Sequence, residues 1–383
     1  MMHSFVNTWK QIPLKWFVGV SAVFLVLILI LGLRPKDFSF SDRVSWITDQ
    51  AGIRFSKYGI AYTDPFIEWA GTNLPQSNGF SIEIALKPAS DRGDGFNFIL
   101  ALYNEKNSEQ LVMGQWRSWI ILMNGDDYAH KKRTKRITVD TAPFPPTTQL
   151  ITVTTGPKGT KVYVGGQLVR SKKKFTLKIP AGAKSRLLLG NSVYNRHSWR
   201  GAVHGLAVYR YPLTAQDAAR HFNGWSKTRK FSFAKPDKPS LLYFFDENGG
   251  ARALDHSGGD HHLKIPSGMP ILKKEILALT WYEFGFNRSH VADIIVNLLG
   301  FLPLGFILSA TLIKSGGTFG KQAVLITLGV CFMTSLTIEI IQAWMPSRSS
   351  DLLDLGANTL GALIGAISGR IFNVWRNELK DEH

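Results

Sequence analysis

The chain has 383 residues, of which 45% are hydrophobic and 19% are charged, and its formal net charge is +17. A single core usually serves roughly 100–200 residues, so this length excludes one small domain. Long apolar runs lie near both ends of the chain and alternating patterns lie between them. This distribution is typical of a membrane protein with a water-soluble insert.

The first apolar run, Trp16 to Leu33, has 18 residues and no charge. That length just suffices for a helix to cross a bilayer. A cleaved signal peptide is the alternative, but Arg34 and Pro35 follow directly where a small-x-small cleavage site would be expected. We therefore expect a cytoplasmic N-terminus over residues 1–15 and a retained transmembrane helix over 16–33.

Short alternating segments separated by Gly, Pro, Asn and Asp follow, and they predict an antiparallel β-sandwich of the jelly-roll type over residues 39–225. The clearest segments are "FSIEIALK" (80–87), "FNFILALYN" (96–104), "QLITVTTG" (149–156) and "HGLAVYR" (204–210). The hairpin 151–170, "LLLGN" and "WRGAVHGLAVYRYPLTAQDAARHF" (199–222) resemble the laminin-G-like, concanavalin A-like lectin and glucanase sandwich. The resemblance implies a fold and no single activity, because such sandwiches include binders, enzymes and spacers.

The sequence offers little support for catalysis or metal binding in the sandwich. Glycosidases need two carboxylates across a cleft, and no strand carries the Glu-x-Asp-x-x-Glu pairing of some glucanases. "DHSGGDHH" (255–262) could hold zinc, but its composition favours a polar turn. Asp91 and Asp94 supply too few oxygens for calcium. We expect no metal site and no cofactor.

Two basic runs, "KKRTKR" (131–136) and "KKK" (172–174), could contact an anionic polymer or lipid headgroups, or could be solvated loops. Residues 226–290 are expected to form a linker and an interfacial segment. In that segment, "ILKKEILALTWYEFGF" (271–286) has the composition of an interfacial helix.

Three further candidate spans, Val291 to Ile313, Ala323 to Met345 and Leu352 to Gly369, predict a helical membrane domain over residues 291–372. A cytoplasmic tail over 373–383 follows. When four spans are threaded alternately, the cations near their ends gather on one side, which the positive-inside rule makes the cytoplasm. These cations are Lys10, Lys15, Lys314, Lys321, Arg370, Arg376 and Lys380. The sandwich is then periplasmic or extracellular, which disfavours nucleic acid as a partner. Cys331, the single cysteine, cannot form an internal disulfide.

Polar residues recur near the outward ends of these three spans. Positions three, four and seven apart share a helix face, so each span offers one polar stripe at a similar depth. Charged groups in lipid are costly unless they are paired or face a cavity. We therefore predict a convergent polar site, with Arg348 neutralising one or two carboxylates. The alternative is that the loop between the third and fourth spans is simply hydrated, and that its polar residues cap the neighbouring helix locally. The predicted site comprises Asp293, Asn297, Glu339, Gln342, Arg348, Asp351, Asp354 and Asn358.

Small residues and a proline are predicted to shape the packing of the helices. The "GALIGAISG" segment is a small-xxx-small face that lets helices approach closely. The "NLLGFLPLGF" segment can bend the second span. The residues concerned are Gly300, Pro303, Gly305, Gly361, Gly365 and Gly369.

"DIIVNLLGFLPLGF" (293–306) and "IEIIQAWMPSRSSDLLDLGANTLGALIG" (338–365) resemble the VanZ-like membrane family. The family pattern N-x-x-x-F-x-P-x-G-F, E-x-x-Q, R, D-x-x-D and N-T-x-G is met. The resemblance implies a membrane bundle and an association with reduced susceptibility to the glycopeptide teicoplanin. A sandwich inserted between the first and second helices departs from the compact family form, so we do not carry resistance over.

Together these patterns predict a multi-pass protein of the cytoplasmic membrane with an outward sandwich. We expect a non-catalytic envelope protein whose sandwich binds or spaces against glycan, and whose polar membrane site holds a lipid-linked saccharide or amphiphilic ligand. The alternatives are a membrane enzyme acting on a lipid-linked saccharide, with Arg348 on phosphate, and ion-coupled transport. The expected partners are the lipid bilayer and envelope polysaccharide, and a homo-oligomer stays open.

Overall fold

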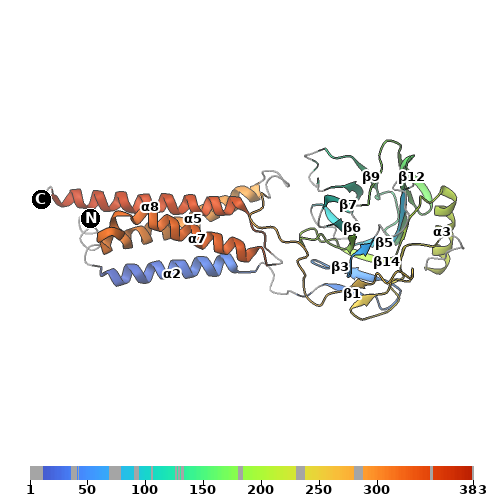
Figure 1. The fold of residues 1–383 in the computed structure, drawn as a ribbon, viewed down its shortest axis with the longest axis horizontal. Coiled ribbons are helices and arrows are strands. Elements are labelled where there is room, and N and C mark those ends of the chain that lie inside the picture. The colour runs from blue at the N-terminus through green and yellow to red at the C-terminus, as the bar shows by residue number, and fades with distance from the viewer. Residues whose placement is uncertain are drawn as a thin grey trace. The chain divides into compact units, whose positions relative to one another are not determined.

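The protein is described from a computed structural model. The structure describes residues 12–35, 41, 43–68, 79–89, 95–104, 107–125, 127, 130, 133–179, 184–229, 238–279, 288–345 and 348–381. Contacts divide the chain into two compact units, a sandwich unit (Ser39–Lys273) and a helical unit (Met1–Phe38 with Lys274–His383) (Figure 1).

The first sheet of the sandwich is antiparallel and has the order β1-β2-β14-β5-β10-β11-β12, with β15 paired to β14. Alternating β-branched and aromatic residues, as in "FSIEIALK", favour these strands. They are β1 (Val44–Trp46), β2 (Ile53–Phe55), β5 (Phe80–Pro88), β10 (Gln149–Gly156), β11 (Gly159–Val164), β12 (Gln167–Lys172), β14 (Gly201–Tyr209) and β15 (Leu241–Tyr243).

The second sheet is also antiparallel and has the order β16-β17-β3-β13-β6-β7-β8-β9, with β4 paired to β13. Its strands are β3 (Ala61–Thr63), β4 (Ile67–Glu68), β6 (Asn97–Asn104), β7 (Asn107–Trp116), β8 (Trp119–Asn124), β9 (Arg136–Asp140), β13 (Lys184–Leu189), β16 (Arg252–Ala253) and β17 (Leu263–Lys264). The antiparallel sandwich predicted from the sequence is thus present.

The core lies between the two sheets, where inward side chains such as Ile84, Leu100 and Val153 are buried. The helix α3 (Ala215–Thr228) covers the outer face of the first sheet, and its Trp225 packs with Ala85 and Tyr209 there. Thr214 caps α3, because its hydroxyl accepts from Asp217 N, while the Asp217 carboxylate accepts from Thr214 N.

Part of the expected linker belongs to the sandwich. Residues 241–264 contribute β15, β16 and β17, so the prediction of a linker is wrong for this stretch. Runs of two or three strand residues are too short to show a period in the sequence, and pairing with β14 and β3 stabilises them. Residues 271–279 are not helical, and 280–287 lie outside the described residues.

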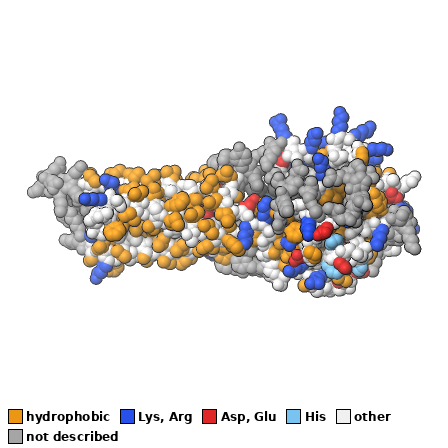
Figure 2. Space-filling model, in the orientation of Figure 1, with side chains coloured by type: hydrophobic (Ala, Val, Ile, Leu, Met, Phe, Trp, Pro, Cys, Tyr) orange, Lys and Arg blue, Asp and Glu red, His pale blue; other side chains and the backbone are white. Residues whose placement is uncertain are grey.

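The helical unit contains α2 (Leu14–Leu33), α5 (Arg288–Ser315), α6 (Gly317–Lys321), α7 (Ala323–Gln342) and α8 (Leu352–Asp381). Four of them are long and apolar enough to span a membrane: Leu14–Leu33, Val291–Ser315, Ala323–Gln342 and Leu352–Trp375. Apolar side chains cover the visible face of this unit (Figure 2), and many on α2, such as Val23 and Leu31, are exposed. Such surfaces suit lipid contact, and the chain is a multi-pass membrane protein.

The helices run alternately up and down. At one end, Lys314 Nζ in the last turn of α5 donates to Ile12 O, just before α2 begins. At the other end, Arg348 binds the carbonyl of Arg34, just after α2 ends. Lys15, Lys314 and Lys321 therefore belong to the same end of the bundle.

Glycines set the close approach of α5 and α8. A Cβ at Gly361 would overlap Leu298 O, one at Gly365 would overlap Leu302 O, and one at Gly305 would overlap Ala362 O. A Cβ at Gly369 would lie 2.9 Å from Phe306 O, whereas one at Gly300 would meet nothing within 4 Å. Pro303 lies inside α5.

Candidate functional site

Glu339 is at the centre of the polar residues in the helical unit. It lies in the last turn of α7, is 2% exposed, and accepts a hydrogen bond of 2.8 Å from Asp351 N. Asp351 in turn caps α8, because its Oδ1 accepts from Leu353 N at 2.9 Å. A carboxylate suits a helix N-terminus, where backbone N–H groups lack partners. Asp351 and Asp354 are close enough to act on Glu339 electrostatically.

Gln342 and Arg348 bind the C-terminal end of α2. Gln342 Nε2 donates to Gly32 O at 2.7 Å, and Arg348 donates to Arg34 O through Nε at 3.0 Å and Nη2 at 2.8 Å. The carbonyls at a helix end lack intrahelical donors and favour a cation. The expectation that Arg348 neutralises the carboxylates is wrong for the described residues, among which its partners are carbonyl oxygens.

The deepest predicted residue, Asn358, is 4% exposed and donates from Nδ2 to Ser335 Oγ at 2.9 Å. Its Oδ1 is shielded from solvent and has no hydrogen-bond partner among the described residues, and the same holds for Thr327 Oγ1 on α7. The polar stripe of α7 thus extends from Glu339 through Ser335 to Thr327, toward the N-terminus of the helix.

Asp293 and Asn297 do not join this group. Asp293 is exposed and Asn297 is half-buried, and within the described part of the chain no hydrogen bond connects either with Glu339 or Asn358. The structure therefore brings together the predicted residues of α7, α8 and their connection, but not those of α5.

The sandwich contains a cavity of about 950 Å³ that sequence analysis did not predict. The lining residues, all of them described, contain no Asp or Glu and five cations: Arg43, Arg54, Lys57, Lys87 and Arg200. On β14, Ala202 lies opposite Arg54 of β2 on one side and Lys87 of β5 on the other. Opposed residues of antiparallel strands share a face, so the small Ala202 separates two cationic side chains.

His204 also lines this cavity and is 6% exposed. Burial lowers the pKa of His204 against the smaller opposing effect of its bond to Ala51 O, and nearby Lys87 and Arg54 lower it further. The ring is therefore neutral near pH 7. Its Nδ1 lies 2.8 Å from Ala51 O and donates to it, which leaves Nε2 as an acceptor. In the described chain that Nε2 has no partner.

Two exposed tryptophans lie in the β7–β8 hairpin, whose turn is hydrogen-bonded to a residue of the cavity lining. Trp116 and Trp119 face each other across the β7–β8 turn and are 42% and 38% exposed. Ser118 O in the same turn accepts from Thr141 N, and Thr141 lines the cavity. Cations and an acceptor therefore line one cavity, and exposed tryptophans lie on the same unit.

The "DHSGGDHH" turn is organised by Asp255, which is 7% exposed. Its two carboxylate oxygens accept from Leu242 N, Ser257 N, Ser257 Oγ and His261 N. These bonds agree with the prediction of a polar turn. Asp91 and Asp94, the calcium candidates, lie outside the described residues. Of the basic run 131–136, Arg136 binds Asp127 and the first two lysines also lie outside.

Family comparisons assign both units. Residues 241–373 match the VanZ/LLP1 family model, and residues 62–219 match the model of the concanavalin A-like lectin/glucanases superfamily. The chain joins a VanZ/LLP1 region to a concanavalin A-like sandwich. The VanZ/LLP1 match begins at Leu241 in β15 and covers every polar residue predicted for the membrane site. A comparison with curated proteins finds no match.

Several solved structures are similar to part of the chain at low identity. A candidate carbohydrate-binding protein from Bacteroides ovatus ATCC 8483 is 12% identical with a TM-score of 0.40, and the match covers 58% of this chain and 61% of that one. The binding domain of Botulinum neurotoxin serotype D is 13% identical with a TM-score of 0.36, and the match covers 49% of this chain and 45% of that one. The CBM40 of the Ruminococcus gnavus IT-sialidase, bound to alpha2,3 sialyllactose, is 13% identical with a TM-score of 0.32, and the match covers 45% of this chain and 95% of that one. Similarities of this size say nothing about what this chain binds.

Proposed function

We propose that this protein is a non-catalytic envelope protein of the cytoplasmic membrane whose sandwich binds an anionic glycan on the outer side. The observation that carries the proposal is the cavity of about 950 Å³ with five cations and no carboxylate in its lining. Several cations that converge on one cavity attract anionic ligands, and the attraction weakens as salt screens it.

Other groups of the sandwich fit a sugar rather than a bare anion. Trp119 is 38% exposed, and aromatic faces pack against the apolar faces of sugar rings. The guanidinium of Arg117 lies over the Trp116 ring, 4.9 Å from its centroid. The Nε2 acceptor of His204 fits a sugar hydroxyl donor. A saccharide with carboxylate or phosphate groups would use both the cations and the His204 acceptor, whereas inorganic phosphate would use only the cations.

Binding of the full chain in nanodiscs to polygalacturonate, with dextran as the neutral comparison, tests this function. We expect salt-sensitive binding to polygalacturonate alone. Replacing Arg54 and Lys87 by Ala should weaken it at least tenfold, and Trp119→Ala should weaken it less. Leu168→Ala and Lys173→Ala are matched controls, because both residues are exposed on the sandwich and absent from the cavity lining. Equal binding by the Arg54/Lys87 variant and the wild type would count against the cavity.

A second site for an amphiphilic or lipid-linked ligand remains a proposal for the membrane region. It is favoured by Asn358 Oδ1 and Thr327 Oγ1, two buried oxygens without partners among the described residues. The contacts of Glu339, Gln342 and Arg348 instead support a structural role, because they join the ends of α2, α7 and α8. General-base work or proton relay by Glu339 would require Glu339→Gln to abolish activity, while a structural role predicts that this variant is tolerated.

A further inference from the structure

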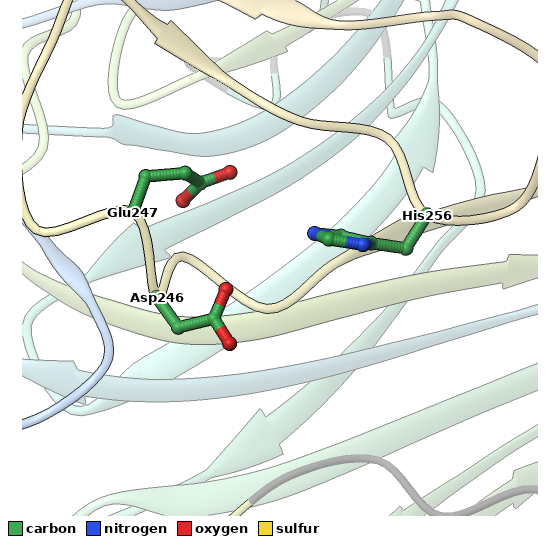
Figure 3. A group of neighbouring side chains, drawn as sticks. All are labelled: Asp246, Glu247 and His256. Atoms are coloured by element: carbon green, nitrogen blue, oxygen red, sulfur yellow. The ribbon is translucent and has the colours of Figure 1, made fainter.

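A second group of side chains in the sandwich has the composition of a metal site. Asp246 and Glu247 follow β15, and His256 lies in the turn organised by Asp255 (Figure 3). One potential ligand atom from each residue lies within 4.8 Å of the other two. Figure 3 shows the imidazole of His256 pointing toward the space between the two carboxylates.

The backbone makes this convergence possible. Consecutive side chains of an extended strand point to opposite faces, so Asp246 and Glu247 would normally diverge. Here Phe245 and Asn248 have φ values of 55° and 57°, and the chain curls between β15 and β16. Both carboxylates therefore face the same space, although the two residues are neighbours in the sequence.

Glu247 is held in place yet has an unused ligand atom. Its Oε1 accepts a hydrogen bond of 2.5 Å from Leu254 N, which fixes the carboxylate. Its Oε2 is shielded from solvent and has no hydrogen-bond partner in the described chain. A buried carboxylate oxygen without a donor is costly, and a bound cation would remove that cost.

His256 is also positioned by a neighbour. Its ring packs on Phe244 with 4.8 Å between centroids and 45° between planes. By contrast, Asp255, the next residue along the chain, has both oxygens occupied by backbone and hydroxyl donors. Asp255 therefore stabilises the turn, whereas His256 lies beside the carboxylates of Asp246 and Glu247.

We propose that Asp246, Glu247 and His256 bind a divalent transition-metal ion, with zinc as the reference. Carboxylate and imidazole ligands bind zinc at about 2.0–2.2 Å, so the three atoms, which lie within 4.8 Å of one another, would move closer together around one ion. Calcium is disfavoured, because it takes six to eight oxygen ligands. Three protein ligands leave a fourth position open, and His256 is exposed, so water or a ligand oxygen could complete the coordination.

Calorimetric titration of the untagged, EDTA-treated full chain in nanodiscs with zinc chloride tests the site. We expect one zinc ion per chain, and at least a tenfold loss of affinity in both Glu247→Gln and His256→Ala. Asp260→Asn should keep the wild-type affinity, because Asp260 is an exposed carboxylate in the same segment and outside the group. Cys331→Ser should also keep it, which separates this site from binding by the thiol.

Circular dichroism of each variant establishes that the sandwich is folded before its affinity is compared. Glu247→Gln keeps an oxygen that can accept from Leu254 N, so it is the variant least expected to disturb the turn. Equal zinc affinity in the wild type and both ligand variants would overturn the proposal, as would calcium binding as tightly as zinc. Loss of zinc binding with polygalacturonate binding unchanged supports a site independent of the glycan cavity.

Discussion

The buried side chain of Glu83 is satisfied by hydrogen-bond partners from several other elements of the sandwich. Glu83 on β5 is 0% exposed, and its carboxyl group lies 2.8 Å from Thr152 Oγ1, 2.9 Å from Tyr209 OH and 2.8 Å from His221 Nδ1. These partners come from β10, β14 and α3. One side chain therefore connects three strands and the covering helix, and a buried polar group is tolerated only with such partners.

Glu83→Ala should destabilise the sandwich by about 3–5 kcal/mol, because it leaves three buried donors without their acceptor. Glu83→Gln should cost less, since an amide oxygen still accepts. Chemical unfolding of the full chain, followed by fluorescence of the buried Trp199 and Trp225, measures both values. A cost below about 1 kcal/mol for the alanine variant would show that the hydrogen bonds are replaced by water.

For the polar residues of the membrane helices, the sequence predicted which side chains share a helix face better than it predicted their hydrogen-bond partners. The stripes Glu339 with Gln342, and Asp351 with Asp354 and Asn358, were recognisable from helical spacing. The partners of Gln342 and Arg348 were not, because Gly32 and Arg34 lie 310 and 314 positions earlier and their backbone carbonyls carry no sequence signal. Sequence analysis also missed the cavity in the sandwich, because Arg54, Lys87 and Ala202 are far apart in the sequence and become neighbours only through strand pairing.

Among the elements, α5 and α8 form the tightest pair of helices in the helical unit. Their glycines allow backbone carbonyls to approach where side chains would otherwise stand, which is how small-xxx-small faces stabilise helix pairs in lipid. A buried hydrogen bond also joins the two helices, because Ser309 Oγ of α5 donates to Ala366 O of α8 at 3.1 Å. The strands β15 to β17 are held differently, because these short elements depend on hydrogen-bonded pairing with β14 and β3.

Gly361→Val should separate α5 from α8 and lower the stability of the bundle by about 1–3 kcal/mol, the usual cost of overpacking. Gly356→Val is the matched control on the same helix, because a Cβ there meets nothing within 4 Å. Thermal aggregation of the two variants in the same detergent gives the comparison. Equal transition temperatures would mean that α5 and α8 can move apart without cost.

For the whole molecule, the four alternating helices put Lys15, Lys314 and Lys321 at one end of the bundle, which agrees with the side that the positive-inside rule assigns to the cytoplasm. Four spans were recognisable from the sequence because each exceeds the minimum length. The membrane side of the sandwich follows only from the charge rule and stays a prediction.

Cysteine labelling tests the orientation, and the native Cys331 is buried and should stay unreactive. In spheroplasts, a membrane-impermeant maleimide should label Lys173→Cys on the sandwich. Ser315→Cys, at the end of α5, should be labelled only after the membrane is opened. The reverse pattern would place the sandwich in the cytoplasm, where an envelope glycan could not reach it.

The contacts of α2 also have a consequence for biosynthesis. Its partners on α5, α7 and the α7–α8 connection, among them Thr311, Gln342 and Arg348, are made only after the whole sandwich has left the ribosome. At about 5–20 residues per second, the ribosome needs more than ten seconds to pass from Leu33 to Arg288. During that interval α2 must stay in the bilayer alone, and its mean hydropathy is the highest of the four spans. The span α8 has the lowest mean hydropathy and carries Asp354 and Asn358, and the other three spans are already synthesised when it enters the bilayer.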